Sequence, residues 1–193
     1  AGHQVFAEPH PEKYFHLPSG TIRAPNARLL LGPGAVINPK KLLDEIAQFE
    51  IGNDRLVIDG QAMIISDEDL EREREMFQNI SSTAQGVGIA SARKMVGRSD
   101  YKAGGALFLA KDCVDLHPFI GSARQVLADA FVRRDRILLE GTQGTSLSLH
   151  HGQYPHVTTR DTTVAGCLAD AGIAPSNVRR VIMVCRTYPI RVG

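Results

Sequence analysis

The residues with the clearest chemical capacity follow an apolar run in the second half of the chain. Ile137-Leu-Leu139 leads directly into Glu140-Gly-Thr-Gln-Gly144, which combines a carboxylate, an amide and two glycines. In α/β proteins, ligands bind beyond the carboxyl ends of parallel strands, and glycine lets the backbone approach a ligand closely. Gln143 offers both a donor and an acceptor, which suits the edge of a base. The same pattern is also compatible with a tight turn that leaves Gln143 on the surface.

A second segment, 152–163, gathers hydroxyl groups and an arginine just before an expected helix. Four threonines and Arg160 fall within 158–163. Hydroxyls, a guanidinium group and a helix N-terminus together favour the binding of a phosphate. Asp161 or Thr162 would also serve simply as a helix cap, and both roles are compatible because a cap leaves other N–H groups available.

A third segment, Ser82-Thr-Ala-Gln-Gly-Val-Gly88, is again small and rich in hydroxyls. Arg93, Lys94 and Arg98 follow it and would neutralise an anion. The segment is not a Walker A loop, which requires GxxxxGK[ST]. A flexible loop followed by a solvated basic helix is the alternative interpretation.

Strands alternating with helices must position these segments, and this alternation predicts an α/β fold with a mostly parallel central sheet and flanking helices. Apolar runs bounded by turn residues indicate the strands. The two runs in the second half of the chain have the composition of strands buried on both faces of a parallel sheet. The predicted strands are Gln4–Ala7, Leu29–Leu31, Leu56–Ile58, Met63–Ile65, Arg136–Leu139 and Val181–Arg186.

Helix boundaries are indicated by local capping signals. Asn38 is a favoured N-cap and Pro39 suits the first helical position. Ser66 with Asp69 resembles a capping box. Gly172 is expected to end the last helix in a left-handed conformation. The predicted helices are Lys40–Phe49, a charged helix after Ser66 to about Gln78, a basic helix from the 82–88 segment to Arg98, Pro118–Val132 and Thr162–Ala171.

Composition limits the class of protein. A chain of 193 residues predicts a single domain spanning 1–193. A formal charge of +1 argues against nucleic acid or an anionic membrane as a partner, and no apolar run is long enough to span a membrane. The N-terminus lacks the pattern of a signal peptide. Three widely spaced cysteines indicate free thiols, so a cytoplasmic location is expected.

Together the motifs resemble the adenylosuccinate synthetase family, in order and over nearly the whole chain. The short distance between the 82–88 segment and Glu140 resembles the compact archaeal and phage-type branch. The matching blocks are Ala1-Gly-His3, Leu17-Pro-Ser-Gly20, Leu31–Pro39, Ser81–Gly88, Glu140–Gly144, Tyr154-Pro-His-Val-Thr158 and Tyr188–Gly193.

The resemblance implies a fold with a P-loop-NTPase-like core and a ligase reaction in purine biosynthesis. The family couples GTP hydrolysis to joining L-aspartate with IMP through a 6-phosphoryl intermediate, with Mg²⁺ as the metal ion. Phage relatives take dGMP, so IMP or dGMP as substrate and GTP or ATP as co-substrate both stay open. A homodimer with a phosphate contact across the interface is also implied.

Site residues follow from the resemblance by position. His3 would assist phosphoryl transfer, and Gly2 would offer its carbonyl to Mg²⁺. Gln143 would hold the 6-position of the purine. A basic residue near Arg98, with Lys94 as a candidate, would reach the phosphate of a neighbouring subunit. The remaining implied substrate ligands are Ser82, Thr83 and Thr158 for the 5′-phosphate and Val192 for the ribose.

The resemblance covers the central portion of the family only. The family's Gly-Asp-Glu-Gly-Lys-Gly-Lys loop would lie upstream of Ala1, and its aspartate-binding and guanine-specificity motifs would lie beyond Gly193. The chain is therefore expected to hold the purine monophosphate half of the site. Two alternatives to a ligase stay open: a catalytically inactive purine-nucleotide-binding or assembly module, and an α/β domain whose glycine-rich turns are purely structural.

Overall fold

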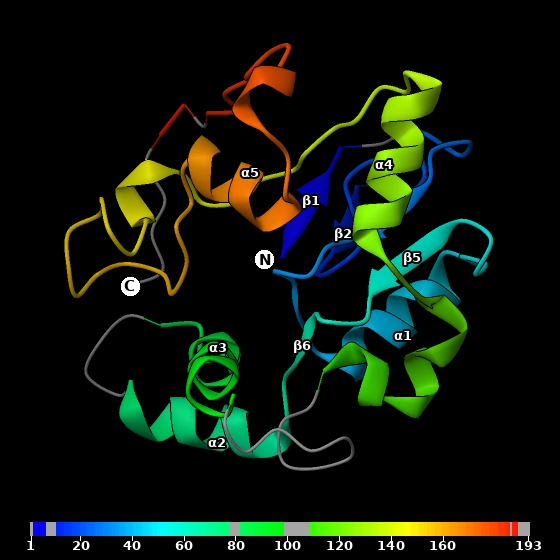
Figure 1. The fold of residues 1–193 in the computed structure, drawn as a ribbon. Helices are drawn as coiled ribbons and strands as arrows, with labels where there is room; N and C mark the ends of the chain where they lie inside the picture. Colours follow the sequence, from blue (N-terminus) through cyan, green and yellow to red (C-terminus); the bar gives the residue numbers. More distant parts are fainter. Residues whose placement is uncertain (1, 7–10, 78–81, 99–108, 186, 189–193) are drawn as a thin grey trace.

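A computed structural model shows how these segments are arranged (Figure 1). Helices α2 (Asp67–Met76) and α3 (Val87–Val96) lie side by side in the lower left of this view, below α5 (Val164–Ala171). The structure describes residues 2–6, 11–77, 82–98, 109–185 and 187–188.

A parallel sheet lies at the centre of the fold. Its order is β3 (Leu29–Leu31), β5 (Leu56–Asp59) and β7 (Ile120–Gly121), with Leu30 opposite Val57 and Ile58 opposite Ile120. All the residues of β5 are buried, as expected for a parallel strand with neighbours on both edges. The predictions at 29–31 and 56–58 are confirmed.

Two further strand pairs flank this sheet. β4 (Val36–Ile37) pairs in parallel with β6 (Met63–Ile64), and β1 (His3–Val5) pairs antiparallel with β2 (Glu12–Tyr14). The strand predicted at 63–65 is confirmed within one residue, whereas β1 begins and ends earlier than the predicted 4–7. Most of the pairing is parallel and helices flank it, so the predicted fold class is confirmed.

Helix α1 (Pro39–Gln48) contributes Leu42 and Ile46 to the hydrophobic core that includes the sheet. Asn38 Oδ1 accepts a hydrogen bond from the Lys41 N–H at 3.1 Å, which confirms the predicted N-cap. Leu42 is fully buried in the core. Glu45, on the same face, accepts hydrogen bonds from the backbone of 15–17, so α1 also anchors the chain that follows β2.

Helix α4 (Ala123–Arg133) begins later than the predicted Pro118. Residues 120–121 instead pair with β5, and this pairing is incompatible with a helix. Ser122 caps α4 by accepting a hydrogen bond from the Gln125 N–H at 3.3 Å. The shorter elements are the 3-10 helices η1 (Ala110–Asp112), η2 (Val114–Phe119), η3 (Thr145–Leu147) and η4 (Pro175–Asn177).

Two predicted helix boundaries match the structure closely. Ser66 and Asp69 form the expected capping box at the start of α2. Gly172 ends α5 with a φ of 66°. Thr163 caps the start of α5 by accepting a hydrogen bond from the Gly166 N–H at 3.2 Å, and the helix begins at Val164, two residues after the predicted Thr162.

The strands predicted at 136–139 and 181–186 are wrong for the residues that the structure describes, and Arg186 lies outside them. Residues 135–140 and 178–185 have no regular secondary structure, and none of the other described residues forms a ladder with them. Leu138 is 83% exposed and Val184 is 94% exposed. A strand of the parallel type requires hydrogen-bonding neighbours, and without them an apolar run stays in solvent.

The sequence contains no apolar run long enough to span a membrane, and the helices of the structure can be compared with that expectation. Within the part of the chain that the structure describes, no helix is long and apolar enough to cross a membrane. The assignment of residues 1–193 to one domain stays a prediction.

Candidate functional site

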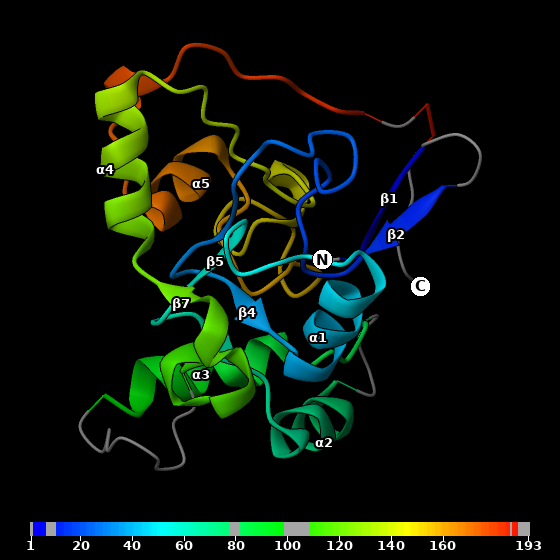
Figure 2. The ribbon, with the colours of Figure 1, turned by 90° about the vertical axis from the view of Figure 1, so that its right-hand side faces the viewer.

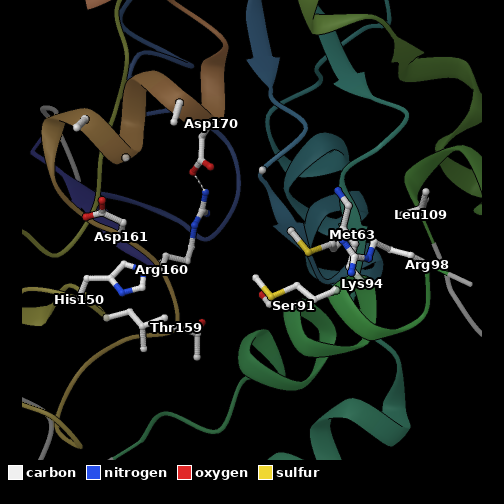
Figure 3. Close-up of a pocket in the computed structure, with 16 residues that line it drawn as sticks. Met63, Ser91, Lys94, Arg98, Leu109, His150, Thr159, Arg160, Asp161 and Asp170 are labelled. Atoms are coloured by element: carbon white, nitrogen blue, oxygen red, sulfur yellow. Dashed lines mark hydrogen bonds and ion pairs between the residues drawn. The ribbon is translucent and has the colours of Figure 1, made fainter.

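A cavity of about 900 Å³ lies between α3 and the segment 149–170 (Figure 3). This size falls within the range of small-ligand sites, roughly 300–1,000 Å³. Ser91, Lys94 and Arg98 extend from the α3 side, while Thr159 and Arg160 lie on the opposite wall. Of the residues that the sequence predicted to bind an anion, Lys94, Arg98 and Arg160 line this cavity.

The Lys94 side chain is hydrogen-bonded to two backbone carbonyl groups. Its Nζ donates to the Gln61 carbonyl oxygen at 2.6 Å and to the Pro33 carbonyl oxygen at 3.3 Å. Burial lowers the pKa of Lys94, and the charges of Asp59 and Asp170 partly oppose this shift. Lys94 is thus engaged with two backbone carbonyl groups, whereas Arg98 is exposed.

The opposite wall contains an ion pair between Arg160 and Asp170. The pair lies against Gly34, where an added Cβ would be 2.8 Å from Asp170 Cγ and 3.1 Å from Arg160 Nη2. A side chain at residue 34 would therefore displace the pair. The Gly32-Pro-Gly34 turn thus contributes to the site by leaving room for a charged pair on α5 and the 152–163 segment.

Asp161 orders the chain that enters α5. The Thr163 N–H and the Ser148 hydroxyl each donate to Asp161 Oδ1 at 3.0 Å. These hydrogen bonds, with the Thr163 backbone first, lower the pKa of Asp161. Asp161 is therefore ionised at neutral pH, and its carboxylate stabilises the backbone of the 152–163 segment by accepting these hydrogen bonds.

The two hydroxyl-rich segments predicted to bind phosphate are in contact. A Cβ added to Gly88 would be 3.0 Å from Thr159 Cγ2, so the start of α3 packs directly against the 152–163 segment. Ser82 and Thr83 are exposed just before this contact. Thr158 lies next to Thr159, and its N–H donates to the Leu147 carbonyl oxygen at 2.8 Å.

The Thr159 hydroxyl is a buried oxygen without a hydrogen-bond partner among the described residues. A buried hydroxyl without a partner destabilises the folded state by about 1–3 kcal/mol. Most buried polar groups in folded proteins are hydrogen-bonded, so an unpaired hydroxyl calls for an explanation. One explanation is that a ligand supplies the partner. Thr159 lines the cavity, while its hydroxyl oxygen itself is covered by the surrounding protein.

The 140–144 turn has a strained backbone at the residue predicted to read a base. Gln143 has a φ of 67°, in the left-handed region that residues other than glycine rarely adopt. This conformation costs roughly 1–2 kcal/mol, and strain of this kind is concentrated at functional positions. Thr142 Oγ1 donates to Gln143 Oε1 at 3.3 Å, and the Thr162 hydroxyl donates to the Gly144 carbonyl oxygen at 2.6 Å. The 152–163 segment thus supports the turn.

Glu140 joins three blocks that are widely separated in sequence. It accepts hydrogen bonds from the Ser19 N–H at 2.9 Å and the Ser19 hydroxyl at 2.7 Å. Its Oε1 also lies 3.4 Å from His3 Nε2. The His3 ring stacks on Tyr14 with ring centroids 5.4 Å apart. The predicted catalytic residue His3 is therefore oriented by an aromatic ring and by a carboxylate of the 140–144 turn.

Gly2, which was expected to bind Mg²⁺ through its carbonyl oxygen, has no cluster of metal-binding side chains around it among the described residues. The described residues contain no group of three or more His, Cys, Asp or Glu side chains that could hold a metal ion. Gly2 lies beside the Phe15 ring, where a Cβ would be 3.5 Å from Phe15 Cδ1. The neighbourhood of Gly2 does not fit Mg²⁺ by itself, and no chemical step is assigned to the ion here. Val192 lies outside the described residues.

Several site residues were missed by reasoning from the sequence alone. Thr159 and Asp170 were not singled out individually, and Glu140 was treated only as part of a motif. Thr159 had a signal, because it sits in a hydroxyl-rich segment. Asp170 and Glu140 had none, because Asp170 looks like an ordinary helix residue and the partner of Glu140 is 121 residues away.

Comparison with known proteins gives an independent result. The sequence family described as adenylosuccinate synthetase matches residues 1–112 and 108–193. The adenylosuccinate synthetase of Thermococcus onnurineus is 34% identical over 198 residues, which cover 100% of this chain and 56% of the relative. The enzyme of Methanocaldococcus jannaschii is 36% identical over 172 residues, covering 86% and 48%. The chain spans about half the length of the curated relatives it matches.

Solved structures agree with this fold. The succinoaminodeoxyadenylate synthetase of cyanophage S-2L, solved with dGMP and with dATP as an energy donor, superposes with a TM-score of 0.73 at 31% identity. Adenylosuccinate synthetase from Plasmodium falciparum superposes with a TM-score of 0.71 at 21% identity, which supports the fold alone. Each superposition covers 91% of this chain and 50% of the other protein. With the whole sequence matched and the fold shared, the chain belongs to the adenylosuccinate synthetase family.

Proposed function

We propose that this chain forms the purine-monophosphate-binding part of an adenylosuccinate-synthetase-type C–N ligase in purine biosynthesis. The reaction joins L-aspartate to IMP, or to a related monophosphate such as dGMP, with hydrolysis of GTP or ATP. Membership of the family supports the ligase class. The cyanophage relative, whose structure holds dGMP with dATP as an energy donor, supports including dGMP as a substrate and an adenine nucleotide as the energy donor.

The observation that carries the proposal is the contact between the two hydroxyl-rich segments at Gly88 and Thr159. It packs the start of α3 against the 152–163 segment, and on this ground we assign the exposed Ser82 and Thr83 to the same site as Thr158. Several hydroxyls beside cationic side chains form a suitable environment for a phosphate, since each donates to its oxygens. In this proposal Ser82, Thr83 and Thr158 bind the 5′-phosphate.

The remaining roles are assigned on chemistry and position. Gln143 reads the purine at its 6-position, because its amide provides both a donor and an acceptor. Its left-handed backbone is consistent with a position held for function. His3 assists phosphoryl transfer, oriented by Tyr14 and Glu140. Phosphoryl transfer depends mainly on positioning and charge stabilisation, which fixed side chains of this kind supply.

The rest of the proposal concerns partners of the whole ligase. Arg98 contacts the phosphate held by a second subunit of a homodimer, and Val192 contacts the ribose through its backbone. Mg²⁺ and GTP or ATP belong to the reaction as the metal ion and co-substrate. Family membership alone supports these two, because the described residues contain no cluster suited to the ion. A cytoplasmic location, without membrane or nucleic acid as a partner, fits a ligase of free nucleotides.

Calorimetric titration of the chain with IMP, dGMP and inosine tests the proposal. Binding of IMP or dGMP with an affinity at least roughly tenfold above that of inosine is expected, since one charge-assisted contact to phosphate is worth that much. Gln143→Ala should weaken IMP binding more than it lowers the free energy of unfolding. The matched control is Gln48→Ala, an exposed glutamine on α1 outside the proposed site. A folded chain that binds neither nucleotide would overturn the proposal, and equal binding by Gln143→Ala and the parent would overturn the role of Gln143.

A further inference from the structure

Helix α2 buries two of its acidic residues. Asp69 is 2% exposed and Glu73 is 4% exposed, although the helix is otherwise highly charged and its other acids face solvent. The two residues are one helical turn apart and lie on the face that packs against α3. A buried carboxylate is unfavourable unless hydrogen bonds or an opposite charge satisfy it. Each of these acids therefore requires a partner, and the two partners differ in kind.

Asp69 has an ordinary structural explanation. Arg93 on α3 donates to both carboxylate oxygens, with Nε at 3.1 Å and Nη2 at 2.6 Å. The same guanidinium donates to the Ile64 carbonyl oxygen at 2.8 Å. Arg93 is thus engaged within the fold, and the Asp69–Arg93 pair clamps α2 to α3.

Glu73 is satisfied in a different way. Its Oε2 accepts a short hydrogen bond from the Gly86 N–H, and its Oε1 accepts one from the Gly88 N–H at 2.8 Å. No Lys, Arg or His within the described residues forms an ion pair with it. The carboxylate therefore occupies the position at the start of α3 where a helix favours an anion.

The backbone around Glu73 is shaped to this contact. Gly86 has a φ of 79°, and a Cβ there would be 2.6 Å from Ile65 Cγ2. A Cβ on Gly88 would lie 2.9 Å from Glu73 Oε1 and 3.0 Å from Thr159 Cγ2. Glu73, the start of α3 and the 152–163 segment thus meet at one point, where larger residues would separate them.

We propose that Glu73 is a positioning residue for the phosphate-binding segment. It ties the Gly86 and Gly88 N–H groups to α2 and so holds the loop that carries Ser82 and Thr83 against the 152–163 segment. Because the Gly86 and Gly88 N–H groups are already used, these two groups do not bind the phosphate, which in this inference is bound by hydroxyls and cationic side chains. This inference rests on the proposed function for the identity of the ligand, whereas the link from Glu73 to the loop stands on the contacts themselves.

The test compares Glu73→Gln with two control variants. Glu71→Gln removes an exposed charge from the same helix, and Asp69→Asn loosens the α2–α3 clamp without touching the 86–88 backbone. Two quantities are measured for each chain: the ratio of IMP to inosine affinity by calorimetry, and the amide hydrogen exchange rates of Gly86 and Gly88. The affinity ratio reports the contribution of the phosphate, which a general loss of stability leaves unchanged.

In Glu73→Gln, the amide group brings an N–H toward a backbone N–H, so one of the two hydrogen bonds is lost. We expect IMP affinity to fall roughly tenfold with inosine affinity unchanged, and the two amides to exchange roughly tenfold faster or more. Glu71→Gln should change neither quantity. Asp69→Asn should lower stability while keeping the affinity ratio of the parent.

Three results would contradict the positioning role. These are unchanged IMP affinity, an equal loss for IMP and inosine, and tighter IMP binding by Glu73→Gln, which would mean that the carboxylate competes with the phosphate. If the parent chain binds neither IMP nor dGMP, the proposed function fails. The exchange rates of Gly86 and Gly88 then still decide whether Glu73 holds the loop.

Discussion

Two segments of this chain have nearly the same sequence pattern and opposite environments. Leu56-Val-Ile-Asp-Gly60 and Ile137-Leu-Leu-Glu-Gly141 each consist of three apolar residues, an acid and a glycine. In the first, Leu56 and Ile58 are fully buried within β5. In the second, Leu138 is 83% exposed and the backbone forms no strand. Identical local patterns therefore led to a strand in one place and to an irregular segment in the other.

Neighbours explain the difference. β5 lies between β3 and β7, which satisfy its backbone groups on both edges, and its apolar side chains pack with α1 and η2 in one core. Residues 137–140 have no ladder partner within the described chain, and the apolar run 181–184 is in the same situation. Figure 2 shows 178–185 running along the upper edge of the molecule, away from β5. An apolar run thus indicates that a segment can be buried, but it becomes a buried strand only where a neighbouring strand pairs with it.

Amide hydrogen exchange should show the largest contrast between the two segments. We expect the amides of 56–59 to exchange at least roughly a thousandfold more slowly than those of 137–139, because β5 opens only with the core. Exchange measured by NMR or mass spectrometry of the chain in solution checks this. Slow exchange at 137–139 would break the comparison, since it would reveal a hydrogen-bonding partner for that segment.

Truncation of one apolar side chain in each segment should differ by several kcal/mol. Ile58→Ala removes a fully buried side chain at the centre of the sheet and should lower the free energy of unfolding by about 2–4 kcal/mol. Leu138→Ala removes an exposed side chain and should change it by less than about 0.5 kcal/mol. Urea denaturation of both variants measures the difference. Similar losses in the two would mean that Leu138 is buried in solution.

Substitution of the acid in each pattern, Asp59 or Glu140, should give the smallest difference in the free energy of unfolding. Asp59 is buried and accepts hydrogen bonds from the Gln61 N–H at 2.9 Å and the Ala123 N–H at 2.8 Å, which joins β5 to α4. Asp59→Asn should cost about 1–3 kcal/mol. Glu140→Gln, at a position 34% exposed, should cost about 1 kcal/mol or less. The same denaturation experiment applies, and a larger loss for Glu140→Gln would show that its contacts with Ser19 and His3 hold the N-terminal strands in place.

The parts of the fold that were predictable have their causes within a few residues. The Asn38 cap with Pro39, the Ser66–Asp69 capping box and the Gly172 end of α5 each depend on contacts within one helical turn. The strands at 29–31 and 56–58 were also predictable, because their neighbours are present. The start of α4 was not, since pairing of 120–121 with β5 is a long-range interaction.

The candidate site divides in the same way. The hydroxyl-rich segments and the Glu140–Gly144 turn were recognisable from composition and from the resemblance to a family. Their mutual contact at Gly88 and Thr159 was not, because 71 residues separate the two positions in sequence. The role of Glu73 was likewise hidden in a helix whose acids all looked solvent-exposed, and only the packing of α2 on α3 set it apart from Glu71.

The amino-acid sequence by itself determined the family, the alternation of strands and helices, the helix caps and the chemical groups available to a phosphate. These depend on short-range signals that each segment carries wherever it lies. The tertiary structure alone decided which apolar runs became strands, which acids were buried, and which loops met to form the cavity. A buried side chain or a strand needs another segment to pack against or to hydrogen-bond with, and that segment comes from a distant part of the chain.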